Sequence, residues 1–253
     1  MKSEITRQLE EIERAENVSI LHAVESGSRA WGFASPDSDY DVRFIYVRRP
    51  EDYLRLDTIR DVIEWTQDDI LDINGWDLQK ALRLLHGSNP TLFEWNNSPI
   101  IYKSSEYWTA VKQEANDYFL RKTGLYHYHS MASSNYREYL KGETVRLKKY
   151  FYVVRPLLAC KWILDKSCPP PVLFSELVEA ELEPEIRPII DNLLRMKIDL
   201  PEVAEGKRID VLNAYIEEAI GDLKEIIENL PPDAKLGWDR LNELFREAVV
   251  TDG

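Results

Sequence analysis

Hydrophobic periodicity changes near residue 115, and this change limits the folds that the chain can adopt. Before it, short apolar and β-branched runs alternate with polar turns, which is typical of strands in a helix-covered sheet. After it, apolar residues return at helical spacing, most clearly from Leu212 to Ile227. We therefore predict an α+β chain, with a small mixed-sheet domain at 1–115 and an all-helical domain at 116–253.

The first domain is expected to contain at least four strands and two long helices. Apolar runs bounded by turn residues predict the strands, and amphipathic spacing predicts the helices. The strands are expected at residues 18–24, 41–47, 61–66 and 70–73, and the helices at residues 4–16 and 76–85.

Composition excludes several classes of protein. Of the 253 residues, 44% are hydrophobic and 30% are charged, which is typical of globular domains and not of disordered chains. No apolar run approaches the about 20 residues that a membrane-spanning helix needs, and the N-terminus lacks a signal-peptide pattern. The two cysteines, Cys160 and Cys168, form no disulfide framework. A cytoplasmic protein without membrane partners is expected.

Charge is distributed unevenly along the chain. The net charge is −13, which argues against indiscriminate binding to nucleic acid, so no DNA duplex is expected as a partner. Arg121–Lys166 nevertheless contains ten Lys and Arg against three Asp and Glu, an excess of seven positive charges, so the remainder carries −20. A basic segment inside an acidic protein indicates a local anionic ligand.

One string between two predicted strands carries the clearest functional signal. It runs from Gly27 to Gly32 and, after a turn, from Asp37 to Arg43, and its central parts are Gly27–Arg29 and Asp39–Asp41. Gly27 and Ser28 stand where a strand passes into a short helix, so backbone N–H groups and the serine hydroxyl can approach an anion. The string therefore predicts a phosphate-binding turn.

The second part of the string predicts a metal site. Asp39 and Asp41 are two residues apart on an extended segment, so their carboxylates point to the same face. Paired carboxylates repel one another unless a cation lies between them, and hard oxygen ligands suit Mg²⁺, or Mn²⁺ in its place. A phosphate-binding turn beside such a pair is what in-line phosphoryl or nucleotidyl transfer requires. Taken alone, Asp39 could simply cap the preceding turn.

The string resembles the Gly-Ser…Asp-x-Asp signature of the polymerase-beta-like nucleotidyltransferase superfamily. Further segments resemble its bacterial branch called YcgL or RlaP, which is linked to RNA repair. These segments are Asp72–Leu82, Ser88–Trp95 and Lys149–Leu158. The resemblance covers most of the chain and implies a palm-like mixed sheet backed by helices, two divalent ions and a nucleoside triphosphate donor.

The same resemblance implies a third carboxylate on a neighbouring strand, and two residues compete for it. Asp72 lies in the predicted strand at 70–73, where its side chain could face the Asp39 and Asp41 pair. Asp77 stands at the start of the following helix, where capping is its natural role. We favour Asp72, and the sequence leaves both open.

A triphosphate also needs cations beyond the metal, and bases stack on aromatic rings. Related enzymes supply both from a helical second domain, which makes the basic segment the candidate source. The predicted nucleotide-binding residues are Gly27, Ser28, Arg29, Lys148, Lys149, Tyr152 and Arg155.

These observations predict a metal-dependent nucleotidyltransferase, with Asp39, Asp41 and Asp72 as catalytic metal ligands. It would transfer a nucleoside monophosphate from an NTP to a hydroxyl and release pyrophosphate. The resemblance and the basic, tyrosine-rich segment favour an RNA 3′ end as acceptor. A hydroxyl on a protein or a small molecule is the alternative, as is a nucleotide sensor without turnover. The sequence does not identify the base or the protein partners.

Overall fold

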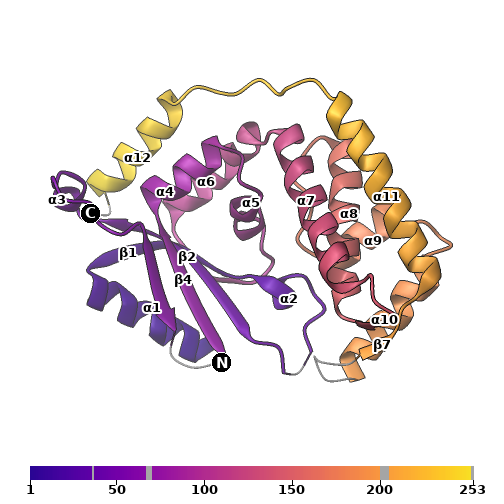
Figure 1. Cartoon of the computed structure of the whole chain (residues 1–253). Coiled ribbons are helices and arrows are strands. Elements are labelled where there is room, and N and C mark those ends of the chain that lie inside the picture. Colours follow the sequence, from indigo (N-terminus) through magenta and orange to yellow (C-terminus); the bar gives the residue numbers. More distant parts are fainter. Residues whose placement is uncertain (36, 67–69, 200–204, 252–253) are drawn as a thin grey trace. The chain divides into compact units, whose positions relative to one another are not determined.

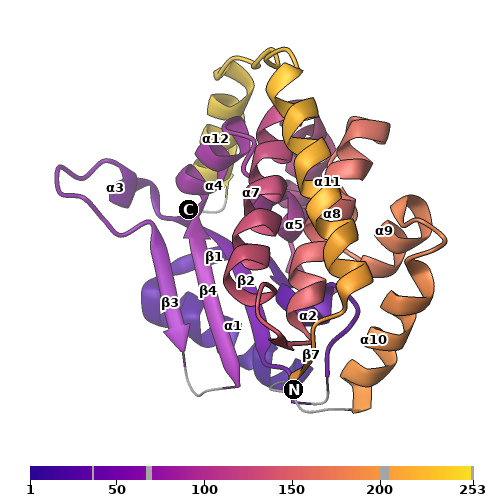
Figure 2. The same ribbon diagram turned by 45° about the vertical axis from the view of Figure 1, so that its right-hand side comes forward.

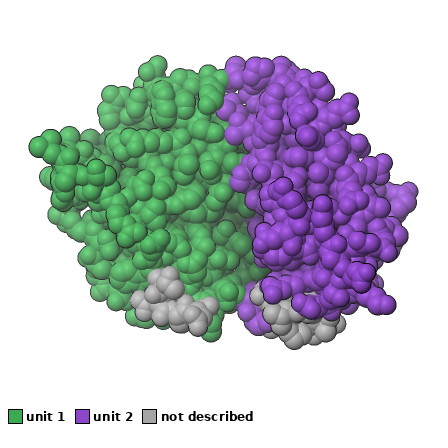
Figure 3. Space-filling model, in the orientation of Figure 1, with its two compact units in different colours: residues 1–30, 39–119, 235–253 green, residues 31–38, 120–234 purple. Residues whose placement is uncertain are grey.

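The computed structural model describes residues 1–35, 37–66, 70–199 and 205–251, and the chain forms two compact units (Figure 3). The first unit contains residues 1–30, 39–119 and 235–253. The second contains residues 31–38 and 120–234. Each unit is built from segments that are separated in the sequence.

A five-stranded mixed sheet forms the centre of the first unit (Figures 1 and 2). Its strand order is β3-β4-β2-β1-β5; β2 and β4 run parallel, and the other neighbours run antiparallel. The strands are β1 (Val18–Glu25), β2 (Tyr40–Arg48), β3 (Val62–Thr66), β4 (Leu71–Asp77) and β5 (Ile101–Ser104). The four predicted strands are confirmed, whereas β5 is an edge strand of four residues that periodicity did not reveal.

Helices cover both faces of this sheet. The first unit contains α1 (Lys2–Glu16), α2 (Gly27–Ala30), α3 (Pro50–Tyr53), α4 (Leu78–His86), α5 (Pro90–Asn96), α6 (Glu106–Ala115), η1 (Asn116–Tyr118) and α12 (Asp239–Thr251). The helix predicted at 76–85 begins two residues later than expected, because Trp76 and Asp77 still belong to β4. Asp77 caps α4 by accepting a hydrogen bond from the Gln79 N–H to its Oδ1 at 2.8 Å.

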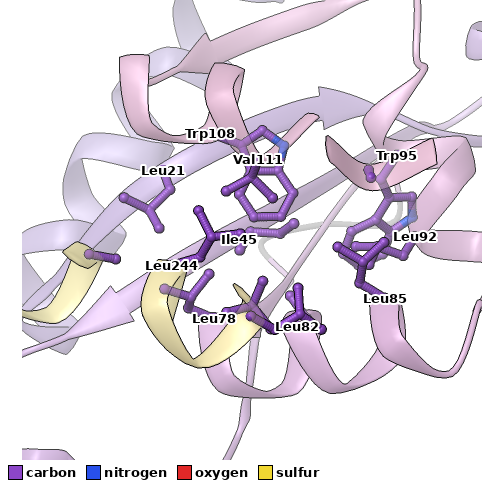
Figure 4. Packing of buried hydrophobic residues seen from close by; sticks show 14 of the residues in the cluster. Leu21, Ile45, Leu78, Leu82, Leu85, Leu92, Trp95, Trp108, Val111 and Leu244 are labelled. Carbon is purple, nitrogen blue, oxygen red and sulfur yellow. The ribbon is translucent and has the colours of Figure 1, made fainter. Parts of the chain in front are cut away.

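Side chains alternate along each strand, so successive residues belong to two different apolar clusters, one on each face of the sheet. On one face, Ile5, Leu9 and Ile12 of α1 pack with residues such as Val42 and Phe44 of β2. The opposite face, drawn in Figure 4, packs against α4, α5, α6 and α12. Its labelled residues are Leu21, Ile45, Leu78, Leu82, Leu85, Leu92, Trp95, Trp108, Val111 and Leu244.

Tight packing around Gly75 gives a first testable prediction. A Cβ at this position would lie 2.1 Å from Phe44 Cε2, inside the buried sheet. We expect Gly75→Ala to lower the free energy of unfolding by about 1–3 kcal/mol because of overpacking. The matched control is Gly221→Ala in a helix, where a Cβ would meet no atom of the described residues within 4 Å. This substitution should raise stability by up to about 1 kcal/mol. Urea denaturation measures both, and equal effects would contradict the packing argument.

The second unit is helical, as predicted, apart from a short two-stranded ribbon. Its helices are α7 (Arg121–Tyr139), α8 (Lys149–Lys166), α9 (Phe174–Glu181), α10 (Arg187–Asp199) and α11 (Asp210–Asn229). The ribbon pairs β6 (Thr144–Arg146) with β7 (Glu205–Lys207), three residues each. Among the described residues of both units, no helix has the length and apolarity to span a membrane.

Residues 31–38 belong to the second unit although they connect α2 to β2 of the first. Phe33 packs against Phe151 and Phe174, with ring centroids 5.2 and 5.5 Å apart. The carbonyl of Trp31 accepts a hydrogen bond from the Phe174 N–H at 2.9 Å. The connection between the two halves of the Gly-Ser…Asp-x-Asp string is therefore part of the helical unit's core. Pro36, in the turn of that string, lies outside the described residues.

Candidate active site

The predicted catalytic residues of the first unit meet at one end of the sheet, where β2 begins. Asp41 of β2 and Asp72 of β4 are direct register partners across the parallel strand pair. Both side chains therefore point to the same face, the one that carries Ile45 further along β2. The side chain of Asp41 is 34% exposed and that of Asp72 is 40% exposed, so solvent reaches both carboxylates.

Arg43 joins the two carboxylates. Its Nη2 donates to Asp41 Oδ1 at 3.0 Å and to Asp72 Oδ2 at 2.7 Å. Its Nη1 donates to the backbone oxygens of Val42 and Asp72, at 3.0 and 3.1 Å. The other carboxylate oxygen of Asp72 accepts a hydrogen bond from the Asn74 amide at 2.6 Å. Two facing carboxylates thus converge on one guanidinium.

Gly27 makes room for Asp41. The backbone of Gly27 has a φ of +61°, in the left-handed region that favours glycine. A Cβ at this position would lie 2.2 Å from Asp41 Oδ2, so only glycine leaves space for the carboxylate. Next to it, the Ser26 N–H donates to the Asp41 carbonyl at 2.8 Å. The start of α2 and the start of β2 are therefore held together through Asp41.

Glu25, the last residue of β1, supports Asp41 from behind. Its side chain is fully buried. Its Oε1 accepts from the Asp41 N–H at 2.8 Å, and its Oε2 accepts from the Tyr102 hydroxyl. Burial raises the pKa of Glu25, and these two hydrogen bonds oppose the shift. The residue positions the backbone that carries Asp41.

Asp39 precedes β2 and is exposed. Its carbonyl accepts a hydrogen bond from Arg29 Nε at 3.0 Å, and the Arg29 guanidinium stacks 3.7 Å above the Tyr40 ring. These contacts tie α2 to the first residues of β2. The predicted Gly27–Arg29 and Asp39–Asp41 segments therefore form one local structure.

The pKa of Asp41 reflects its burial and the charges around it. Burial is the largest cause of its raised pKa, and the negative charges of Asp72 and Asp39 raise that pKa further. The Arg43 guanidinium acts in the opposite direction. Two further carboxylates thus act on Asp41 at this end of the sheet, as expected of a site built for a positive ligand.

The donor set suits a hard divalent cation. Carboxylate oxygens on neighbouring strands are the ligands that Mg²⁺ and Mn²⁺ prefer, and the Arg43 guanidinium already occupies the place of a cation between two of them. Across residues 1–35, 37–66, 70–199 and 205–251, no three His, Cys, Asp or Glu side chains are already gathered as a metal-binding group. Asp41 and Asp72 instead share their arginine.

Comparison with known proteins identifies the family. Residues 1–247 match the family model described as RlaP, the RNA repair pathway DNA polymerase beta family. The chain belongs to this family. It is also 44% identical over 254 residues to the uncharacterized protein YcgL of Bacillus subtilis (strain 168), an alignment that covers 98% of this chain and 96% of that protein.

A similar solved structure is the crystal structure of a nucleotidyltransferase-like protein from Exiguobacterium sibiricum 255-15. It shares 14% sequence identity with this chain, covers 88% of this chain and 74% of its own, and has a TM-score of 0.34. Membership of the RlaP family makes the chain a polymerase-beta-family nucleotidyltransferase associated with an RNA repair pathway.

The two candidates for the third carboxylate of this RlaP-family chain lie at different places in the first unit. Asp72 lies directly opposite Asp41, whereas Asp77 caps α4 and accepts a hydrogen bond from the Tyr53 hydroxyl at 2.9 Å. Asp77 is only 4% exposed. Its position is explained by the helix start, and Asp72 is the residue that the fold brings to Asp41.

The remaining predicted nucleotide-binding residues lie in the second unit. Lys149 Nζ lies 3.8 Å from the centroid of the Tyr139 ring and 5.0 Å from that of Tyr152. Arg155 is 2% exposed, and its guanidinium lies 4.5 Å from the Trp31 ring. Arg155 thus packs inside the helical unit, while the half-buried Lys148 stands at the start of α8.

Two residues of the site were not predicted. Arg43 has the same parity along β2 as Asp41, so alternation alone puts it on the face of the carboxylates. Glu25 is a charged residue at the end of an otherwise apolar strand, immediately before the Gly27–Arg29 turn. Both signals were present in the sequence, but their meaning depends on which strands pair.

Proposed function

We propose that the chain transfers a nucleoside monophosphate from an NTP to the 3′ hydroxyl of an RNA, with release of pyrophosphate. Residues within 1–115 would carry out the chemistry, and helices within 116–253 would bind nucleotide and acceptor. The observation that carries the proposal is the convergence of Asp41 and Asp72 beside Gly27 in a chain of the RlaP family.

Each residue of the sheet site has a role in this proposal. Asp39, Asp41 and Asp72 would hold Mg²⁺ or Mn²⁺, which would neutralise phosphate charge and lower the pKa of the acceptor hydroxyl. The backbone at Gly27, the Ser28 hydroxyl and the Arg29 guanidinium would bind the terminal phosphates. Glu25 would keep Asp41 in position through its backbone N–H.

The reaction is an in-line displacement at the α-phosphorus. The acceptor oxygen forms a bond to the α-phosphorus, the bond from that phosphorus to the bridging oxygen breaks, and pyrophosphate leaves. The acceptor hydroxyl loses its proton to solvent. The contribution of the protein is then chiefly to place both substrates and to stabilise charge.

The charge of the basic segment Arg121–Lys166 supports an RNA acceptor. This segment consists of α7, α8 and the residues between them, and it holds ten Lys and Arg against three Asp and Glu. Arg137 near the end of α7 and Lys141 and Arg146 in the following segment are exposed, and Tyr139 at the end of α7 lies against Lys149. Exposed cations beside aromatic rings suit a nucleic-acid end, since cations pair with phosphates and rings stack on bases.

Pyrophosphate release from each of the four NTPs tests the proposal. It is measured with Mg²⁺ and with Mn²⁺, in the presence and absence of a pool of small RNAs. We expect RNA-dependent release with the wild-type protein and none with Asp39→Ala. The matched control is Asp57→Ala, because Asp57 is an exposed carboxylate paired with Arg55 outside the site. RNA-independent release would point to a protein or small-molecule acceptor, and NTP binding without release would point to a sensor.

A further inference from the structure

Arg43 lies where a cation shared by Asp41 and Asp72 would lie. Like charges directly opposite one another on neighbouring strands destabilise a sheet. Here Arg43 Nη2 contacts one oxygen of each carboxylate, at 3.0 and 2.7 Å, and so compensates this repulsion. The arginine is 17% exposed, less than either of its partners. It is therefore the inner member of the cluster and not a mobile surface charge.

Backbone contacts fix the guanidinium in this place. Nη1 donates to the carbonyls of Val42 and Asp72, so the arginine makes four hydrogen bonds with two nitrogens. Each carboxylate also has a second oxygen that does not contact Arg43. Asp41 Oδ2 lies against Gly27, and Asp72 Oδ1 accepts the amide of Asn74. A divalent cation that takes Asp41 Oδ1 and Asp72 Oδ2, the two oxygens that converge on Arg43, must displace the guanidinium.

We propose that Arg43 is a resident counter-ion that competes with the divalent metal for Asp41 and Asp72. It keeps the facing carboxylates together in the absence of metal, and it makes binding of metal alone weak. An arriving triphosphate offers the displaced guanidinium new anionic partners, so metal and nucleotide bind together and not metal first. The inference rests on the assignment of Asp41 and Asp72 as metal ligands in the proposed function.

Binding of Mn²⁺ without nucleotide tests this directly, because the free aqueous ion gives an electron paramagnetic resonance signal that disappears on binding. We expect Arg43→Gln to bind Mn²⁺ at least about 10-fold more tightly than the wild-type protein, which is about 1.4 kcal/mol. Arg43→Lys keeps the charge but loses the two hydrogen bonds by which Nη1 fixes the group to the backbone, so its affinity should fall between the two. Arg60→Gln, which removes an arginine paired with Glu64 on the surface, should leave the affinity unchanged.

Thermal unfolding gives an independent readout. In EDTA, Arg43→Gln should melt below the wild-type protein because the carboxylates have lost their counter-ion. Mn²⁺ should then raise the melting temperature of the variant by more than that of the wild-type protein. If the role of Arg43 were confined to packing, Arg43→Gln would lower the melting temperature by the same amount with and without metal.

The outcomes separate this inference from the proposed function. Equal or weaker Mn²⁺ binding by both Arg43→Gln and Arg43→Lys overturns the counter-ion role while Asp41 and Asp72 remain ligands. Binding that survives in Asp41→Asn and Asp72→Asn overturns the ligand assignment itself. Absence of Mn²⁺ binding in every variant overturns both. If Arg43→Gln does not fold, Arg43→Lys carries the comparison.

Discussion

Asp41→Asn is expected to reduce kcat/KM for nucleotidyl transfer by at least about 1000-fold, since carboxylate-bound metal contributes several kcal/mol and each 1.36 kcal/mol is a factor of ten. The change is nearly isosteric. It keeps the backbone hydrogen bond to Glu25 and the contact with Gly27, and removes only the negative charge. Steady-state pyrophosphate release measures the loss.

The same substitution should not destabilise the protein at neutral pH without metal. Chiefly because of burial, the pKa of Asp41 in the folded protein lies above its ordinary value of 3.8. Below pH 3.8 the carboxyl is protonated in both folded and unfolded states. As the pH rises through the folded-state pKa, the unfolded chain binds fewer protons than the folded one, so the aspartate lowers stability. Asparagine does not titrate, so the variant gains stability relative to wild type above pH 3.8.

A matched control completes the experiment. Asp57→Asn removes a carboxylate that is 65% exposed and paired with Arg55, and should leave activity unchanged. Asp41→Asn protein that unfolds cooperatively and keeps more than about a tenth of wild-type activity would rule out Asp41 as an essential ligand. A variant that melts well below wild type at pH 7 in EDTA would contradict the electrostatic argument.

Local patterns were sufficient to predict most of the sheet. Strands such as β1 and β2 are apolar, β-branched runs bounded by turn residues, and their observed ends lie within one residue of the predicted ones. The predicted start of the helix at Trp76 was two residues too early, because Trp76 and Asp77 fit both a strand and the first turn of a helix. Their own pairing with Ile45 and Tyr46 of β2 places them in the strand.

Features that depend on pairing or packing with distant parts of the chain were not predicted from the sequence. The ribbon joins Val145 to Gly206, and each of its strands is too short to show a period of two. The C-terminal helix α12 also returns to the first unit, where Leu241 and Leu244 pack with the sheet. Its amphipathic pattern predicts a helix but not the surface against which that helix packs.

The candidate site also combines residues that local sequence predicts with residues whose role depends on strand pairing. The Gly27–Arg29 and Asp39–Asp41 segments could be recognised because they form one short string with a direct physical meaning. Asp72 could only be favoured over Asp77, since its place beside Asp41 depends on the parallel register of β2 and β4. Arg43 gains a role only once that register brings the two carboxylates to it.

Gly27→Ala is expected to have the second large effect, because it displaces the Asp41 carboxylate without removing it. The added methyl would lie 2.2 Å from Asp41 Oδ2 and 3.1 Å from its Cγ, so the side chain must move. A misplacement of about 1 Å can cost about 100-fold in rate, and we expect at least that loss in pyrophosphate release. The left-handed φ of +61° adds a strain of about 1–2 kcal/mol to the folded state.

Gly32→Ala is the matched control for the strain. Gly32 has a φ of +84°, and among the described residues a Cβ there would come within 4 Å of Leu173 Cδ2 alone, at 3.1 Å. Its substitution should lower the free energy of unfolding by a similar amount and leave the catalytic rate within a few-fold of wild type. Similar losses of activity in both alanine variants would assign the effect to backbone strain and not to displacement of Asp41.

A double-mutant cycle separates the clash from the strain. In an Asp41→Ala background no carboxylate opposes the new methyl, so Gly27→Ala should cost only the strain energy in urea denaturation. In the wild-type background it should cost the strain plus the clash, and the difference between the two is the coupling energy. A coupling close to zero would mean that the turn absorbs the methyl without moving Asp41. A clear coupling would mean that Gly27 is needed for the space it leaves as well as for its backbone conformation.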